Sequence, residues 1–425
     1  MSLPRMPLPR SETHILVNFF AALFGCVALI AMQIYAEKWD NFFKTLVVIS
    51  SVILPILLAD ICWLKPHHHS SSGLHALSPR SLKRVLIKTI GMYGVFTFYG
   101  LLYHLLPIYE TSFYNPYWQL LSLLMPWIIF LTPFYIGYLD RRMDNPMDEY
   151  YHMGNACLLR FNKVDLDQIK TLLRHWLVKA FFFPLMFIYL LQNVTQFSYV
   201  DWQHLSGFKQ WYKTLNNGLY LVDLLFASTG YIMTLRLVNA QIRSSDPTFF
   251  GWFIALICYA PFWNDVLYQN YFAYDKNGGF LAWTHAHPFW MIFIGTCSLV
   301  LVAIYVWATI AMGYRFSNLT YRGLVSSGPY RLTKHPAYVA KNISWWLIGL
   351  PFLTKASYAD ALQNCILLLG INGIYFLRAR TEEAHLSQFP EYVAYAEVMN
   401  ERSIFAPLAR LIPALRFQRD LKSDP

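Results

Sequence analysis

Long apolar segments constrain the fold of this chain more than any other feature of its sequence. They follow one another from end to end and are separated by short polar loops. A transmembrane helix needs about 20 mostly apolar residues. The expected spans lie near residues 15–35, 43–64, 86–107, 117–138, 177–194, 218–240, 249–268, 289–312, 338–353 and 360–377. We therefore expect an all-α, polytopic integral membrane protein of about ten transmembrane helices, in which the last two form a tight hairpin.

The composition excludes a water-soluble fold of this size. Hydrophobic residues make up 56% of the 425 residues and charged residues only 14%, whereas soluble domains carry about 25% charged residues. A bilayer accommodates that much apolar surface because hydrocarbon is the solvent. The first apolar segment is too long for a cleavable signal peptide and is expected as a span. The bacterial cytoplasmic membrane and the endoplasmic reticulum both suit such a chain.

The basic residues predict the orientation of the chain in the membrane. Lys and Arg number 34 against 24 Asp and Glu, and they lie between the apolar segments. This placement suits anionic lipid headgroups and argues against a nucleic-acid partner. If the N-terminus is inside, the outside loops hold only Lys38, Lys209, Lys213, Lys276 and Lys355. Both termini are therefore expected on the cytoplasmic side.

The cysteines and histidines do not indicate a metal site. None of the six cysteines belongs to a CxxC pair, so neither a zinc site nor a disulfide framework is indicated. We interpret the segment HHHSSSGLH, from His67 to His75, as a polar cytoplasmic loop, with metal binding as the alternative.

Charged residues also occur inside the expected spans. Segment 218–240 contains Asp223 and Arg236, and the next segment contains Asp265. Charges within spans are costly and usually face a cavity or a partner. Each of these three lies toward one end of its span, where it can reach water. The alternative is a polar pocket for a lipid headgroup.

The sequence after the eighth segment contains the residues that point to a chemistry. Three pieces stand out, namely LVSSGPYRLTKHPAY (Leu324 to Tyr338), RARTEE (Arg378 to Glu383) and EYVAYAEVM (Glu391 to Met399). In the second piece, Arg378 and Glu382 are four residues apart and Arg380 and Glu383 three apart, so both pairs can form on a helix. The simpler interpretation is two snorkelling arginines and solvated glutamates at a helix end.

Together these pieces resemble the isoprenylcysteine carboxyl methyltransferase family and its wider group, which includes bacterial phospholipid methyltransferases. The resemblance covers roughly residues 290–410. It divides the chain into an N-terminal multi-span membrane region, residues 1–288, and a methyltransferase-like module, residues 289–425. It implies S-adenosylmethionine as cofactor, bound at the cytoplasmic membrane face by the hairpin and a cytoplasmic helix. The implied partner is a lipid or lipidated, isoprenylcysteine-like acceptor, and no obligate protein partner is indicated.

The resemblance also assigns roles to residues near the hairpin. His335 and Tyr338 would contact the cofactor, and Glu382 or Glu383 would hold its polar end. Carboxylate and aromatic groups suit a ligand that carries a sulfonium cation and an ammonium. His335 is also a catalytic candidate, because an amine acceptor needs a base to lose a proton and a carboxylate acceptor does not.

Five further residues complete the implied site. Leu324, Gly328 and Tyr330 would lie against the cofactor through backbone or ring. Arg378 would bind the cofactor, because a guanidinium forms a bidentate fork with a carboxylate, and Arg380 is the second catalytic candidate.

Two features leave questions open. Lys341 stands where many members of the family have a small residue, so it would narrow or recharge the substrate entrance. Tyr392 and Tyr395 are three apart on the expected terminal helix, where a packing role and a pocket role are equally compatible with the sequence.

Two other functions compete with methyl transfer. Sterol reductases that use NADPH have about ten spans and a related hairpin, but their pattern RHxNYxGD differs from KHPAYVAK in this chain. The other alternative is a membrane scaffold or transporter without catalysis.

The topology can be tested with reporter fusions. Because Lys and Arg gather in alternate loops, fusions after Pro425 and after Asn216 should report opposite sides of the membrane. The measurement compares a reporter active only in the cytoplasm with one active only outside it. Activity of the same reporter at both points would contradict the ten-span topology.

Overall fold

The computed structural model describes residues 7–75, 77, 79, 81–275, 278–354 and 357–418, and these are almost entirely helical. The α-helices are α1 (Ile15–Tyr35), α2 (Asn41–Ala59), α3 (Leu82–Leu105), α4 (Asn115–Asp140), α5 (Glu149–Cys157), α6 (Leu166–Ser198), α7 (Phe208–Ile232), α8 (Phe249–Leu256), α9 (Gly279–Trp283), α10 (Pro288–Met312), α11 (Pro336–Gly349), α12 (Tyr358–Leu386), α13 (Pro390–Arg402) and α14 (Ala406–Leu411). Two short strands, β1 (Ser244–Ser245) and β2 (Thr320–Tyr321), pair antiparallel.

Seven of the helical segments in the described residues are long and apolar enough to cross a membrane. They comprise α1, α2 with its following turn, α3, α4, α6, α10 and α12. This confirms the all-α, polytopic membrane class. Of the other three expected spans, α7 has 25 residues but is not among the seven, and α11 has only 14. The expected span 249–268 is interrupted, because α8 ends at Leu256 and a π-helix follows over Phe262–Phe272. The count of ten spans thus stays a prediction.

Several sequence expectations need adjustment. Arg236 lies beyond α7, which ends at Ile232. Asn216 lies inside α7 rather than in the preceding loop, so a fusion at Gly207 tests that loop more directly. The expected last span, 360–377, is part of a longer helix, because α12 continues through the RARTEE piece to Leu386. Two of the outside-loop lysines, Lys276 and Lys355, lie outside the described residues.

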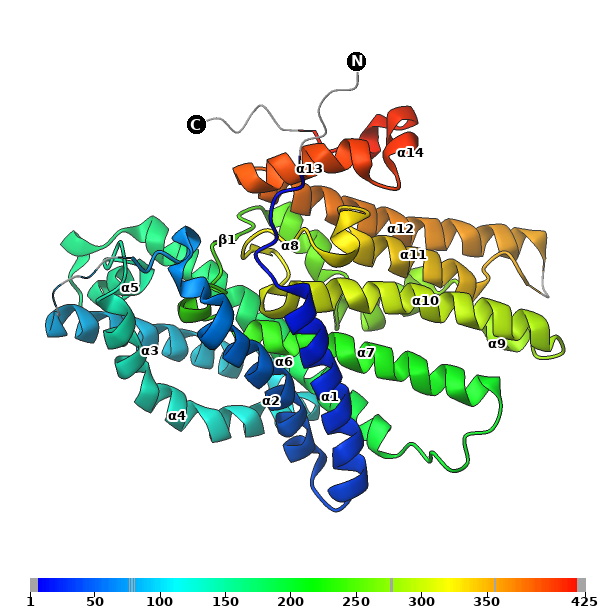
Figure 1. Ribbon diagram of the computed structural model, residues 1–425, viewed down its shortest axis with the longest axis horizontal. Coiled ribbons are helices and arrows are strands. Elements are labelled where there is room, and N and C mark those ends of the chain that lie inside the picture. Colours follow the sequence, from blue (N-terminus) through cyan, green and yellow to red (C-terminus); the bar gives the residue numbers. More distant parts are fainter. Residues whose placement is uncertain are drawn as a thin grey trace.

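The helices form two groups that meet in the middle of the molecule (Figure 1). Helices α10, α11 and α12 lie side by side and α7 packs against α10, whereas α3, α4 and α5 gather at the opposite end. Helix α6 packs against α7 and also contacts the α3–α5 group. The first and last parts of the described chain pack near α13, since Leu8 and Phe417 lie in the same cluster as Tyr392 and Tyr395.

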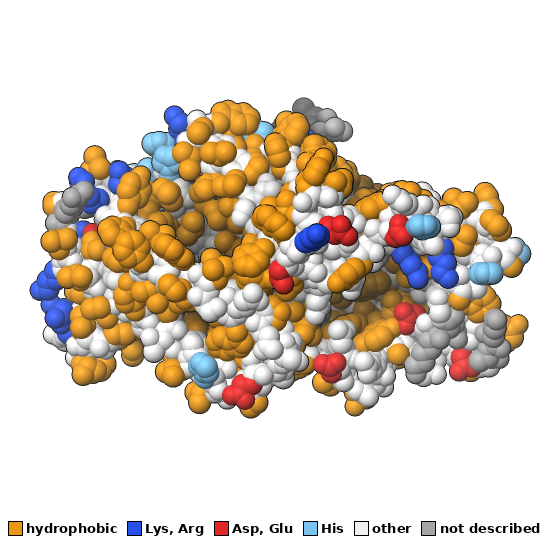
Figure 2. Space-filling model, turned by 90° about the horizontal axis from the view of Figure 1, so that it is seen from below, with side chains coloured by type: hydrophobic (Ala, Val, Ile, Leu, Met, Phe, Trp, Pro, Cys, Tyr) orange, Lys and Arg blue, Asp and Glu red, His pale blue; other side chains and the backbone are white. Residues whose placement is uncertain are grey.

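The outer surface is apolar, as a bilayer requires. Figure 2 shows hydrophobic side chains over most of one face, with Lys and Arg along the edge of the α3–α5 end and in smaller groups near the centre and toward the opposite end. On α4, Trp127, Phe130 and Phe134 are each more than half exposed. Side chains of this size facing water would be unfavourable, and in hydrocarbon they are not.

The α3–α5 group is joined by close backbone contact and buried ion pairs. Arg84 pairs with Asp140 at 2.7 Å, and the buried Lys88 pairs with Asp148 at 3.0 Å. A Cβ added at Gly154 of α5 would lie 1.9 Å from the carbonyl oxygen of Ile87 on α3. A side chain therefore cannot enter here without separating the two helices.

This contact gives a stability prediction with an internal control. Gly154→Ala should destabilise the protein by about 1–3 kcal/mol, because the added methyl group overpacks the interface. Gly100→Ala, on the same α3, has nothing within 4 Å of its Cβ and should instead stabilise the helix by up to about 1 kcal/mol. Thermal unfolding of both variants in the same detergent checks this. Equal unfolding temperatures for the two variants would contradict the interface.

Candidate functional site

The site loop, residues 313–335 between α10 and α11, is held in place by a buried arginine. Arg322 is 2% exposed and donates to the carbonyl oxygens of Gly230, Phe316 and Ala240 at 2.8–2.9 Å and of Met233 at 3.2 Å. Two of these carbonyls belong to the end of α7, where helix carbonyls lack internal partners. A cation at this position is also favoured by the helix dipole.

The N-terminal segment fixes the same loop from the other side. Glu12 forms ion pairs with Arg243 at 2.5 Å and Arg315 at 3.0 Å, and its backbone N–H donates to the carbonyl oxygen of Leu324 at 2.9 Å. Burial by itself would raise the pKa of the Glu12 carboxyl, but the hydrogen bonds from Arg243 and the charge of Arg315 keep this pKa below its ordinary value. Ser326 adds a hydrogen bond to the carbonyl oxygen of Pro9 at 2.6 Å.

The short sheet ties this loop to the rest of the chain. Ser244 of β1 pairs with Tyr321 of β2. The Tyr321 hydroxyl donates to Glu391 at 2.6 Å, and its ring stacks on Phe389 with the ring centres 3.9 Å apart. The connection after α7, the site loop and α13 therefore meet at one point.

The two ends of the hairpin meet through Glu383. His335 Nε2 lies 3.0 Å from Glu383 Oε1, and Lys334 Nζ lies 2.7 Å from the same oxygen. Arg380 pairs with the other oxygen at 2.9 Å. Glu383 is only 5% exposed and pairs with three side chains. It therefore links the start of α11 to the end of α12.

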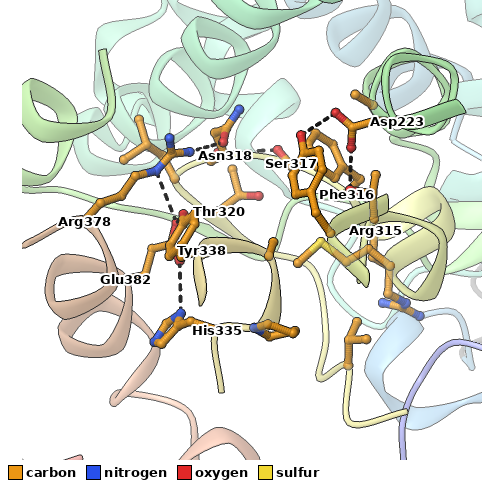
Figure 3. A pocket seen from close by; sticks show the side chains of 18 of the residues that line it. Asp223, Arg315, Phe316, Ser317, Asn318, Thr320, His335, Tyr338, Arg378 and Glu382 are labelled. Carbon is orange, nitrogen blue, oxygen red and sulfur yellow. Dashed lines mark hydrogen bonds and ion pairs between the residues drawn. The ribbon is translucent and has the colours of Figure 1, made fainter. Parts of the chain in front are cut away.

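Glu382, the neighbouring carboxylate, faces a cavity instead. Tyr338 donates a hydrogen bond to it, and Arg378 Nε lies 3.6 Å away. His335 Nδ1 is 3.8 Å from its second oxygen. Figure 3 shows Arg378, Tyr338, Glu382 and His335 together on one side of this cavity. Both predicted Arg–Glu pairs are thus present. The pair Arg378–Glu382 lines the cavity, whereas the pair Arg380–Glu383 lies outside it.

Arg378 is immobilised by residues from distant parts of the chain. Its guanidinium donates to Asn318 and lies over the rings of Tyr259 and Tyr338, 5.4 and 5.3 Å from their centres. The hydroxyl of Tyr231 on α7 accepts hydrogen bonds from the backbone N–H and the side-chain amide of Asn318 at 3.0 and 2.9 Å. The guanidinium is therefore oriented before any ligand binds.

The cavity has a volume of about 520 Å³ and lies between α6, α7, α10, α12 and the site loop. Six of the residues predicted from the sequence line it, namely Leu324, Tyr330, His335, Tyr338, Arg378 and Glu382. Gly328, Arg380 and Glu383 do not. Gly328 faces Ile15 and Trp307 instead, and Arg380 also donates to the carbonyl oxygen of Arg416.

The structure answers the question about the two tyrosines of α13. Both line the cavity. Tyr395 donates to the carbonyl oxygen of Tyr330 at 2.7 Å, whereas the buried hydroxyl of Tyr392 has no hydrogen-bond partner among the described residues. Burial raises the pKa of Tyr392, so its hydroxyl stays a neutral donor. Thr320, which also lines the cavity, has a second buried hydroxyl without a described partner.

At the far end of the cavity, sequence reasoning singled out Asp223 but missed its partners Tyr305 and Thr309. Asp223 is 7% exposed, and accepts hydrogen bonds from Tyr305 and from Thr309, the latter at 2.6 Å. The sequence pointed to this end of the cavity only through Asp223, a charged residue in an apolar segment. Of the two sequence interpretations of Asp223, the structure favours the polar pocket over a position that reaches water. In Figure 3 Asp223 lies on the opposite side of the cavity from Arg378.

Fold and cavity define a polytopic membrane protein with a polar site closed by its C-terminal hairpin. Residues 290–388 match the model of the isoprenylcysteine carboxyl methyltransferase family, a family of membrane methyltransferases. This match confirms the resemblance of the C-terminal region. The domain boundary at residue 288 stays a prediction. Neither the curated proteins nor the solved structures contain a significant match.

The two tyrosines give a prediction about stability. Tyr395→Phe should lower the free energy of unfolding by about 0.5–1.5 kcal/mol, because a buried hydrogen bond is lost. Tyr392→Phe should cost nothing or stabilise slightly, because its hydroxyl is buried without a partner. Thermal unfolding of the ligand-free variants measures the difference. A loss for Tyr392→Phe as large as that for Tyr395→Phe would contradict this assignment.

Proposed function

We propose that this protein is an S-adenosylmethionine-dependent methyltransferase whose acceptor is a membrane lipid or a lipidated molecule. The observation that carries the proposal is the closure of a polar cavity by the two hairpin ends within the region that matches the family model. His335 from one end and Glu382 from the other both face this cavity. The solvated helix end considered from the sequence would have no such enclosure.

The cavity residues suit the chemical groups of this cofactor. Glu382 and the rings of Tyr330 and Tyr338 suit the sulfonium and ammonium cations. The hydroxyls of Tyr392 and Thr320 are donors for a carboxylate, and buried polar atoms without partners are rare unless a ligand or water satisfies them. The volume of about 520 Å³ lies within the range of small-molecule sites.

The chain contributes mainly orientation to the reaction. The bound cofactor supplies a methyl group on a sulfonium, and methyl transfer is an in-line displacement, so most of the catalysis comes from positioning. The Glu383 carboxylate accepts from Nε2–H of His335, so the neutral imidazole has its lone pair on Nδ1. That atom is the proton acceptor if the methyl group goes to an amine.

Arg380 acts indirectly in this proposal. It does not line the cavity, but its ion pair with Glu383 holds the carboxylate that orients His335. Leu324 and Arg378 line the pocket directly, whereas Gly328 lies outside it in the loop that carries Leu324 and Tyr330.

Ligand binding tests the proposal directly. The purified protein in detergent should bind S-adenosylhomocysteine with a dissociation constant on the order of micromolar, about −8 kcal/mol, and should not respond to NADPH. Isothermal calorimetry with both ligands measures this. A response to NADPH alone would favour the reductase, and a response to neither would favour a scaffold or transporter.

Carboxylate variants test the site. Glu382→Gln should weaken S-adenosylhomocysteine binding by about 10- to 100-fold, because a charge-assisted contact contributes about 1.5–3 kcal/mol. Glu383→Gln and His335→Ala should mainly reduce methyl incorporation from labelled donor into membrane lipids. Glu401→Gln is the control, because Glu401 is exposed and pairs only with Arg410 and Arg416 in the described structure. If all variants match this control, the site assignment fails.

A further inference from the structure

A second cavity adjoins the site loop. It has a volume of about 460 Å³, within the range of small-molecule sites. Its walls come from the N-terminal segment, the start of α1, the end of α2, the connection after α7 and part of the site loop. Most of these residues precede the region that matches the family model. Arg315 lines both cavities, so the two lie on either side of this side chain.

A buried carboxylate faces this second cavity without a partner. Asp60, directly after α2, is 8% exposed and lines the cavity. Within the described residues, its carboxylate forms neither a hydrogen bond nor an ion pair. A buried charge without a partner is costly, and buried polar groups are rarely left unsatisfied unless a ligand or water meets them. Asp60 therefore indicates the position of a cationic group in a ligand.

The other charges of the cavity are either paired or lie at its opening. The charged and ionisable residues of its walls are Arg10, Glu12, His14, Asp60, His69, Arg315 and Arg331. Arg315 pairs with Glu12 at 3.0 Å rather than with Asp60. Arg10, His69 and Arg331 are exposed and form no ion pair in the described part of the chain. The cavity is thus negative at Asp60 and positive where it opens.

The start of α1 adds a site for an anion. Its N-cap residue His14 forms no capping hydrogen bond, so the N–H groups of the first turn have no side-chain acceptor, and these groups and the helix dipole favour a negative charge. Val17 and Asn18 of this turn line the cavity. His14 Nδ1 is buried and has no hydrogen-bond partner among the described residues.

The anion site and Asp60 lie close together. The ring of His14 packs against that of Trp63, three residues after Asp60, with the ring centres 5.0 Å apart. The start of α1 therefore lies beside the end of α2. Apolar side chains, namely Val17, Ile56, Leu64 and Val238, form much of the remaining wall. A compact ligand with both charges and an apolar group would satisfy all three features.

We propose that the second cavity binds a free α-amino acid with an apolar side chain. The ammonium pairs with Asp60, the carboxylate lies at the start of α1 and toward Arg10 and Arg331, and the side chain packs on the apolar wall. A ligand with only one of the two charges leaves part of the cavity unsatisfied, and so it binds less tightly. The open side is polar and charged, which suits a ligand that enters from water. The site is independent of the proposed methyl transfer.

Three molecules that share a carbon skeleton test this selectivity. L-leucine carries both charges, isopentylamine lacks the carboxylate, and 4-methylpentanoate lacks the ammonium. Binding of radiolabelled L-leucine to the full-length protein in a non-ionic detergent is measured in competition with each molecule. L-leucine should bind at least about tenfold more tightly than either analogue, the range expected for a charge-assisted contact. Equal competition by one analogue, or no saturable binding of L-leucine, would overturn the proposal.

Variants assign the two ends of the ligand. Asp60→Asn should weaken L-leucine binding by about tenfold or more and leave the binding of 4-methylpentanoate unchanged. Glu37→Gln is the control, because Glu37 is exposed and follows the other end of α1, and it should change nothing. An unchanged affinity for L-leucine in Asp60→Asn would overturn the assignment. The wild-type series decides the selectivity even if Asp60→Asn does not fold.

The cofactor cavity needs its own control, because S-adenosylhomocysteine also has an amino-acid end. Saturating S-adenosylhomocysteine should leave labelled L-leucine bound, and Glu382→Gln should not change the affinity for L-leucine. Displacement of L-leucine would place it in the cofactor cavity and overturn the second site. Saturable, Asp60-dependent binding of L-leucine to a protein that does not bind S-adenosylhomocysteine would retain this site and reject the methyltransferase.

Discussion

The site depends on the satisfaction of one buried cation. Arg322 lies buried in the loop between α10 and α11, where its charge would be costly without partners. Backbone carbonyls at the end of α7 and in the following connection supply them. Carbonyls at a helix end would otherwise lack hydrogen-bond donors. The guanidinium of Arg322 supplies these donors, and the carbonyls supply its acceptors. That exchange fixes the loop that carries Leu324, Tyr330 and His335, and so it positions the wall of the cavity.

A second constraint divides the roles of two adjacent carboxylates. Glu382 and Glu383 follow each other on α12, so their side chains point about 100° apart on the helix. One faces the cavity, and the other bonds to Lys334, His335 and Arg380. In the proposed function, Glu382 binds the cofactor and Glu383 positions His335. Both carboxylates are contacted from the same two segments, the start of α11 and the end of α12, but mostly by different side chains.

The N-terminal helices take part in the site as well as in the membrane. Tyr231 of α7 orients Asn318, which in turn holds Arg378, and Glu12 anchors the loop from the N-terminal side. The hydrophobic core likewise mixes both parts of the chain, since Val302 and Tyr314 pack in the same cluster as Ala21 and Phe182. A module that matches the family model over residues 290–388 is therefore completed by residues that precede it.

The sequence by itself determined the membrane class, the helical hairpin and the chemical character of its two ends. Apolar length and a motif of nearby residues are local properties, so HPAY, RARTEE and the spacing of Arg378 and Glu382 could be interpreted without a structure. Only the tertiary structure decided which carboxylate faces the cavity, and that Tyr392 has a buried hydroxyl without a described partner. It also showed that Asp223 and Lys341, more than 100 residues apart, share one chamber. Such contacts depend on how distant helices pack, which no local pattern records.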